Sequence, residues 1–154
     1  MSVLGAIRPP DSWNLPLFLH VLGAMVLVGA TLAALTALVA GWRRDAAPYT
    51  RFAFWTLLVV GLPAFVLMRA GAQWIYSKEG FSGEDDPTWV GIGFLVGDPG
   101  ALVLLLTLIV TGIGTWRLRG GGETSAVTRI GAALTTILLA AYVIAVWAMG
   151  AKPD

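Results

Sequence analysis

Four long apolar stretches alternate with short polar segments along this chain of 154 residues. The apolar stretches cover residues 15–42, 52–76, 99–117 and 126–149. About 20 apolar residues in a helix cross a hydrocarbon core of ~30 Å, so each stretch is long enough to span a bilayer. Helices of this kind have no polar face that water could solvate. The pattern therefore predicts an all-α fold, a single-domain four-helix transmembrane bundle.

Local signals refine the ends of these spans. Asp98-Pro99-Gly100 places a capping carboxylate before a proline, which predicts that the third helix begins there. The preceding ten residues, 88–97, are apolar but too short to cross a bilayer, so we expect a separate interfacial or re-entrant segment. Pro63 lies inside the second span and is predicted to kink it, because proline lacks a backbone donor.

Basic residues concentrate in two of the connecting loops. Six of the ten lie in or beside the connection between the first and second spans or that between the third and fourth: Arg43, Arg44, Arg51, Arg117, Arg119 and Arg129. The positive-inside rule therefore predicts that these loops are cytoplasmic and that both termini are on the outer side. The acidic run Glu84-Asp85-Asp86 would then lie in the outer loop as a solvated turn. The apolar run after Pro16 exceeds a signal-peptide core, so we expect the first helix to be retained.

Composition supports a membrane protein and excludes several other classes. Hydrophobic residues make up 57% of the chain and charged residues only 12%, about half the share in soluble domains. A net charge of +1 without a basic face excludes a nucleic-acid binder. The chain has no cysteine, so it has no thiolate metal site and no thiol nucleophile. We expect a multi-pass protein of the bacterial plasma membrane, with the lipid bilayer and a membrane-protein partner or a second copy as its partners.

The groups with interesting chemistry are predicted to share one depth in the outer leaflet. They are His20, Met68, Arg69, Asp98 and Met149, each near the outer end of a span. His20 is the only histidine, and with the thioethers of Met68 and Met149 it would suit Cu(I). The plainer interpretation is a structural imidazole that bonds to a backbone carbonyl or to Asp98. Arg69 either extends to the headgroups or pairs with Asp98.

Thr107, Thr111 and Thr115 form a stripe along the third span. Their hydroxyls could line a polar path, or they could bond to carbonyls one turn earlier and permit close packing. The sequence contains no P-loop, nucleophile elbow or zinc-protease helix. We therefore predict no catalytic residues.

Two short motifs resemble a known group of proteins. Leu19-His20-Val21-Leu22-Gly23-Ala24 resembles the opening of small bacterial integral membrane proteins of unknown function, and 147–153 resembles their W-x-M-x-x-K-P tail. That group is similar in its first helix to the CopD copper-resistance domain and the HemJ-type protoporphyrinogen oxidases. The resemblance implies that His20 is a copper or haem b ligand. Haem would then take Met149, Met68, water or a partner subunit as its other ligand.

Three functions are compatible with these features. The first is a non-catalytic accessory subunit or small-ligand binder. The second is a haem- or copper-binding redox protein centred on His20. The third is an oligomeric transporter or channel subunit that uses the threonine stripe.

Overall fold

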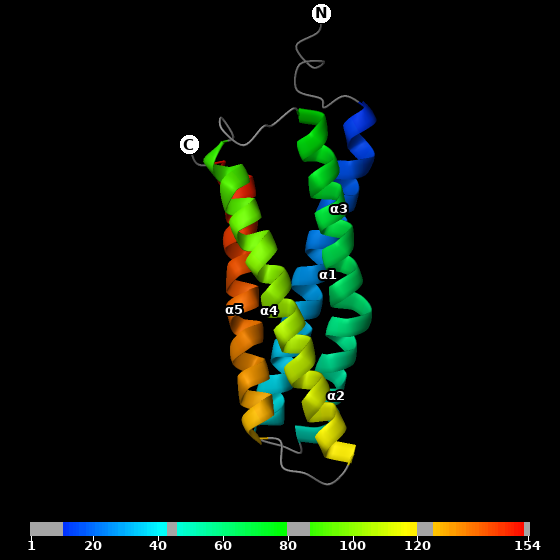
Figure 1. Ribbon diagram of the computed structural model, residues 1–154, viewed down its shortest axis with the longest axis vertical. Helices are drawn as coiled ribbons and strands as arrows, with labels where there is room; N and C mark the ends of the chain where they lie inside the picture. Colours follow the sequence, from blue (N-terminus) through cyan, green and yellow to red (C-terminus); the bar gives the residue numbers. More distant parts are fainter. Residues whose placement is uncertain (1–10, 43–45, 80–86, 120–124, 153–154) are drawn as a thin grey trace, which may run out of the picture.

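The computed structural model describes residues 11–42, 46–79, 87–119 and 125–152, and these residues are almost entirely helical. The elements in chain order are α1 (Asp11–Gly41), α2 (Ala46–Thr56), the π-helical turn η2 (Leu57–Gly61), α3 (Leu62–Glu79), α4 (Thr88–Arg119) and α5 (Ser125–Ala151). Figure 1 shows α2, η2 and α3 as one continuous rod beside α1. The acidic run at 84–86 lies outside the described residues.

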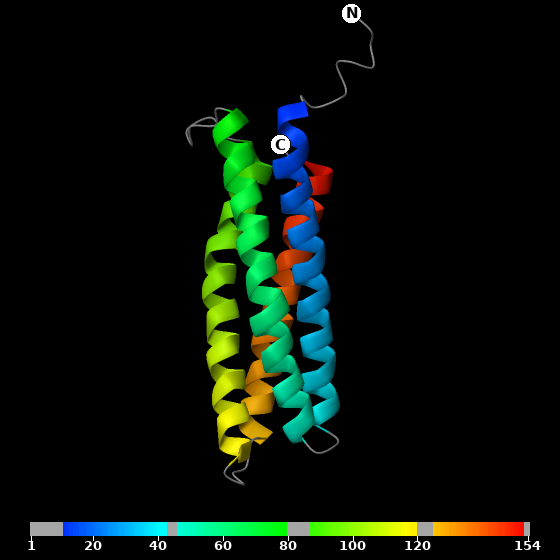
Figure 2. The ribbon, with the colours of Figure 1, turned by 90° about the vertical axis from the view of Figure 1, so that its right-hand side faces the viewer.

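Within the described residues, four helical stretches are long and apolar enough to cross a membrane: Asn14–Gly41, Ala46–Glu79, Thr88–Leu118 and Ala126–Ala151. The predicted four-helix transmembrane bundle is confirmed. The exterior is apolar, with large side chains such as Phe18, Val59 and Ile137 more than half exposed. Such a surface is suited to lipid rather than to water. In Figure 2, α1 begins and α5 ends at the same end of the bundle.

The predicted separate segment over 88–97 is wrong. These residues form the first turns of α4, which continues through Pro99 to Arg119. The helix begins instead at Thr88, directly after Pro87, whose carbonyl accepts from the N–H groups of Val90 and Gly91. Proline removes only one backbone hydrogen bond, and the long apolar run on both sides keeps the helix intact in lipid. Asp98 and Pro99 are both exposed, so the interruption lies on the outer face of the helix.

The irregularity predicted at Pro63 takes the form of the π-helical turn η2. The N–H of Leu62 donates to the carbonyl of Leu57, five residues earlier. Pro63 cannot donate, and its ring would collide with the carbonyl four residues back, so the chain widens by one residue just before it. Leu57 and Gly61 are both buried in this turn.

Helix α1 packs against the α2–η2–α3 rod and α5, whereas α4 packs mainly against α5 and α2. Helices α3 and α4 touch at only a few residues. Leu27, Leu38, Leu57, Leu104 and Leu138 are fully buried and form much of the core. The bundle is therefore tightly packed around α1 and looser between α3 and α4.

Candidate functional site

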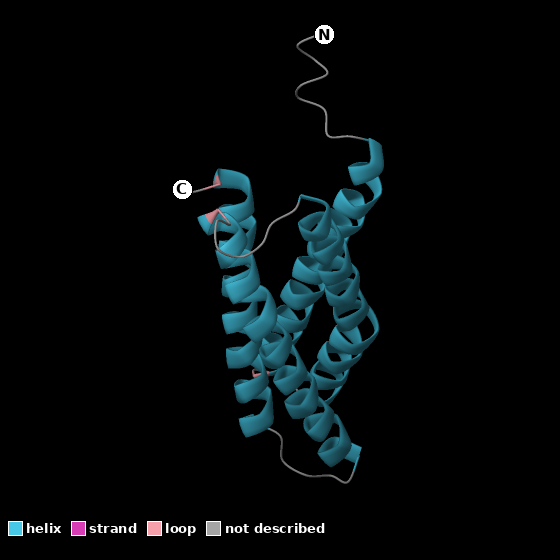
Figure 3. Ribbon diagram, turned by 45° about the horizontal axis from the view of Figure 1, so that its top comes forward, coloured by secondary structure: helices cyan, strands magenta, loops and turns pink. Residues whose placement is uncertain are grey.

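A cavity of about 910 Å³ lies between the α1–α3 pair and the α4–α5 pair. It occupies the end of the bundle where α1 begins and α5 ends, and Figure 3 shows the two pairs of helices separated there. Most of its lining is apolar, with His20, Met68, Trp89, Tyr142 and Met149 among the lining residues. The weak contact between α3 and α4 leaves this space unfilled.

His20 joins α1 to α3 through a hydrogen bond at the cavity wall. Its Nδ1 lies 3.0 Å from the carbonyl oxygen of Met68, and a carbonyl can only accept, so Nδ1 donates. The hydrogen bond fixes the tautomer of the neutral ring and leaves a lone pair on Nε2. Among the described residues Nε2 has no hydrogen-bond partner. The imidazole is therefore held in place by one nitrogen and available to a ligand through the other.

Two glycines permit this hydrogen bond by letting the backbones of α1 and α3 approach closely. A Cβ added at Gly71 would lie 2.6 Å from the backbone nitrogen of His20, and one at Gly23 would lie 2.5 Å from that of Met68. Neither position has room for a side chain. Small residues at helix contacts commonly allow such an approach in membranes.

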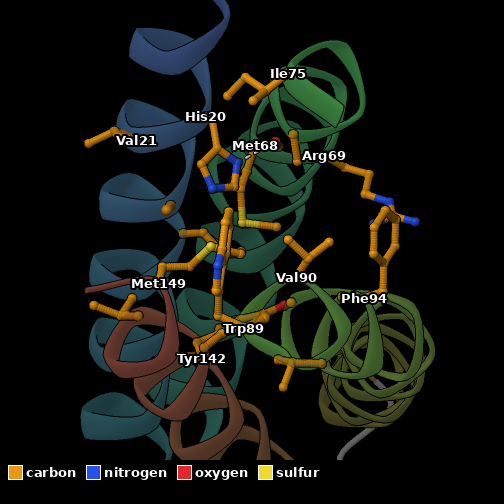
Figure 4. A pocket seen from close by; sticks show the side chains of 18 of the residues that line it. His20, Val21, Met68, Arg69, Ile75, Trp89, Val90, Phe94, Tyr142 and Met149 are labelled. Atoms are coloured by element: carbon orange, nitrogen blue, oxygen red, sulfur yellow. Dashed lines mark hydrogen bonds between the residues drawn. The ribbon is translucent and has the colours of Figure 1, made fainter. Parts of the chain in front are cut away.

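The two predicted thioethers line the same cavity from different helices. Met68 comes from α3 and Met149 from α5, and Figure 4 shows both side chains extending into the space below the His20 ring. The methyl group of Met149 packs against Gly93 of α4, where an added Cβ would lie 2.6 Å away. Among the described residues, no three His, Cys, Asp or Glu side chains cluster as a metal site. Any metal here would depend on one imidazole nitrogen and thioether sulfurs.

Arg69 and Asp98 form an ion pair at the edge of the cavity. Nη2 of Arg69 lies 2.6 Å from Oδ1 of Asp98, so the pairing alternative holds rather than free extension to the headgroups. The guanidinium also lies 4.8 Å from the centroid of the Phe94 ring, which packs edge-on against Tyr76. These contacts connect α3 to α4 where the helices are otherwise apart. Asp98 itself does not line the cavity.

Tyr142 and Lys152 are among the lining residues that the sequence analysis did not predict. The hydroxyl of Tyr142 is buried and has no hydrogen-bond partner among the described side chains and backbone. Lys152 follows the last residue of α5 in a left-handed conformation, φ 46°, and its ammonium lies 5.3 Å from the Trp89 ring centroid. The signal for Tyr142 was its spacing of seven residues from Met149, which places both on one face of a helix.

The threonine stripe lies elsewhere and is internally bonded. The hydroxyls of Thr107, Thr111 and Thr115 donate to the carbonyls four residues earlier, at 2.7, 2.7 and 2.9 Å. All three residues are buried, and the methyl group of Thr111 packs against Gly131 of α5. Nothing in this arrangement favours a polar path, and the transporter hypothesis gains no support from it.

No protein-family model matches this chain, and neither do any curated proteins or solved structures. The resemblance to the CopD and HemJ-type proteins therefore stays a prediction. What the site can do chemically follows from its own groups. It can enclose an apolar molecule, accept a hydrogen bond or coordinate through Nε2 of His20, and donate through the hydroxyl of Tyr142.

Proposed function

We propose that this polytopic membrane protein lies in the bacterial plasma membrane and binds a small lipophilic ligand, as a non-catalytic binding or accessory subunit. The observation that carries the proposal is the apolar cavity of about 910 Å³ with the unpartnered Nε2 of His20 on its wall. Ligand sites are typically apolar cavities of roughly 300–1,000 Å³ with a few polar groups that orient the ligand.

Nε2 of His20 is a polar atom on an apolar wall, and this favours a ligand with a matching polar group over a lipid acyl chain. His20 is partly buried, and a nitrogen lone pair that faces an apolar ligand without a hydrogen-bond partner is unfavourable. An acyl chain would fill the volume but leave Nε2 unsatisfied. A ligand that donates a hydrogen bond to Nε2, or coordinates to it, would satisfy both the shape and the chemistry.

The test is to identify what co-purifies with the protein. We expect organic extracts of detergent-purified protein to contain one compound in an amount close to that of the protein, measured by mass spectrometry. Ala145→Phe fills the cavity and should abolish its retention, since Ala145 is a lining residue. Ala140→Phe is the matched control, because Ala140 is exposed on the same helix and outside the cavity.

Two results would contradict the proposal. One is an extract of the wild-type protein that holds only membrane lipid and detergent. The other is an equal amount of the same compound in Ala145→Phe and in the wild type.

A second candidate is a haem b or Cu(I) protein, favoured by the presence of two thioethers beside the imidazole. The donor set fits: Nε2 of His20 would be the nitrogen ligand, with Met68 or Met149 as a thioether ligand. The hydrogen bond from Nδ1 to Met68 is the kind of support that metal-bound histidines usually have. Either group would supply one-electron redox chemistry when bound.

The absorption spectrum and metal content of the purified protein test this candidate. We expect a Soret band or one copper per chain, retained in Thr36→Ala and lost in His20→Ala. Thr36 is exposed on the same helix and outside the cavity, so it serves as the control. A protein that stays colourless and metal-free after incubation with haem and with Cu(I) would exclude the candidate.

A further inference from the structure

Tyr142 is the deepest of the α5 residues that line the cavity, counted from the end of the bundle where α5 ends. From α5 the cavity is lined by Tyr142, Ala145, Val146, Met149 and Lys152, which share one helix face. At a rise of 1.5 Å per residue, Tyr142 is about 15 Å deeper along the helix than Lys152. Figure 4 shows Tyr142 among the side chains around the cavity.

Among the described residues, the hydroxyl of Tyr142 is the fully buried side-chain polar atom that has no hydrogen-bond partner. Tyr142 is 4% exposed, and its hydroxyl has no partner among the described residues. The ring packs against Gly100 of α4, where an added Cβ would lie 3.4 Å from Cε1 of the ring and 3.8 Å from the hydroxyl oxygen. By contrast, the buried hydroxyls of Thr31, Thr111 and Thr135 each donate to a backbone carbonyl. A buried hydroxyl without a partner calls for an acceptor, and because its own accessible surface is below 1 Å², an acceptor in the cavity reaches it only when the ring moves slightly away from Gly100.

We infer that the Tyr142 hydroxyl donates a hydrogen bond to the ligand, and that the ligand is a lipophilic carbonyl compound with its oxygen at the inner end of the cavity. This inference rests on the proposed function and specifies its ligand class. Only an acceptor satisfies the unpaired O–H. A carbonyl accepts without bringing a further proton, whereas a ligand hydroxyl would need an acceptor of its own beside Tyr142.

The polar groups of the cavity are then complementary along its length. Tyr142 offers a donor at the inner end, and His20 offers the Nε2 acceptor nearer the opening. The wall between them is apolar and includes Leu27, Val28 and Ala145. An elongated apolar molecule with a carbonyl at its buried end and a hydrogen-bond donor near its other end would satisfy both Tyr142 and His20 without leaving a polar group against this wall. The other possible occupant of the hydroxyl is a water molecule, which the experiment separates.

The test uses two probes of similar length, n-decyl-1,4-benzoquinone and n-decylbenzene, with the full-length protein in lipid nanodiscs. We expect the quinone to bind more tightly than the hydrocarbon. Tyr142→Phe should weaken quinone binding by between about 5-fold and about 100-fold, the range expected when a buried carbonyl loses its donor. The same substitution should leave the affinity for n-decylbenzene unchanged. Tyr49→Phe, at the opposite end of the bundle and outside the cavity, should leave both affinities unchanged.

Two further measurements report on the hydroxyl directly. The infrared carbonyl stretch of the bound quinone should lie at lower frequency in the wild type than in Tyr142→Phe, because a hydrogen bond weakens the C=O bond. Without any probe, Tyr142→Phe should be at least as resistant to thermal unfolding as the wild type, since the substitution removes an unsatisfied polar group.

The outcomes distinguish this inference from the proposed function. Equal quinone affinity in Tyr142→Phe and the wild type, with lower stability of the variant without probe, would show that the hydroxyl holds a water and would overturn the inference. If Ala145→Phe still excluded both probes in that case, the proposed function would stand. If neither probe bound the wild type and its extracts held no retained compound, both would fall.

Discussion

At the scale of single residues, the position of His20 depends on two glycines nearby, whose lack of a side chain lets α1 and α3 approach. One hydrogen bond between a side chain and a helix in lipid averages well under ~2 kcal/mol, too little to pull two helices together. The approach of α1 to α3 is set instead by Gly23 and Gly71, whose missing side chains leave backbone against backbone. The hydrogen bond to Met68 then selects the ring orientation that presents Nε2 to the cavity.

A methyl group at Gly23 should separate the helices. In Gly23→Ala the new Cβ would lie 2.5 Å from the Met68 backbone nitrogen and 2.8 Å from the Ala64 carbonyl oxygen, and neither atom can move without its helix. We expect a loss of about 1–3 kcal/mol in the free energy of unfolding, measured by denaturant titration. The ¹⁵N chemical shift of Nδ1 should also report loss of the hydrogen bond.

Gly29→Ala is the control for this prediction. Gly29 lies on the same helix, with nothing within 4 Å of an added Cβ. Alanine should be neutral there or stabilise the helix by up to about 1 kcal/mol. Similar unfolding free energies for the two variants would mean that Gly23 does not control the helix contact.

The Arg69–Asp98 pair should contribute little to stability although it is short. The two side chains are 30% and 65% exposed, so solvent and headgroups screen the attraction. A double-mutant cycle with Arg69→Gln and Asp98→Asn should give a coupling energy of about 0.2–1 kcal/mol. A coupling above ~2 kcal/mol, measured by denaturant unfolding, would instead mean that the pair is well shielded in the folded protein.

Sequence reasoning reached some of these residues and missed others for a physical reason. His20, Met68, Arg69 and Met149 were found because each is unusual within an apolar span, and the structure places all four around one cavity. Tyr142 was missed because tyrosine is ordinary in a membrane helix. Its importance comes from having no partner across the interface, which only the packed structure reveals.

At the scale of elements, the rod formed by α2, η2 and α3 keeps the same face toward α1 along its length because it contains a single extra residue. A π-helical turn holds one residue more than an α-helical turn, and η2 lies between α2 and α3, both packed on α1. If the turn were regular, everything after it would rotate by about 100°. Met68, whose carbonyl accepts from His20, would then face away from α1.

Deletion of one residue should therefore be tolerated inside the π-helical turn but not inside a regular α-helix. Deletion of Val59, which is 61% exposed, should convert η2 to α-helix while α2 and α3 keep their facing residues. We expect a folded protein that still retains its ligand. Deletion of Val143, 55% exposed in the regular helix α5, should rotate Met149 by about 100° from its place and abolish folding or retention. Both variants can be compared by size-exclusion chromatography and ligand retention, and equal disruption would contradict the role of η2.

The elements themselves were largely predictable because hydropathy in a membrane leaves few alternatives. The four spans follow from length and apolarity alone. The start of the third span could not be predicted in this way. Asp98-Pro99-Gly100 is a strong capping signal locally, but it lies within a helix of 32 residues. Lipid favours helix so strongly that one lost hydrogen bond at Pro99 does not end it.

At the scale of the whole molecule, the two ends of the bundle differ in structure as well as in charge. The cavity and the Arg69–Asp98 pair lie at the end where α1 begins and α5 ends, whereas Arg51 and Arg117 lie at the other. The predicted orientation would place the cavity in the outer leaflet. Its ligand would then arrive from the outer leaflet or the extracytoplasmic side.

The chain's lack of cysteine allows this orientation to be measured without background labelling. Ser77 and Pro48 are exposed near opposite ends of the rod formed by α2, η2 and α3. In intact bacteria, a membrane-impermeant maleimide should label Ser77→Cys, whereas Pro48→Cys should react only after the membrane is permeabilised. The reverse labelling pattern would mean that the bundle has the opposite orientation in the membrane, with the cavity in the cytoplasmic leaflet. The geometry of the site would be unchanged, but its ligand would then have to be a compound available from inside the cell.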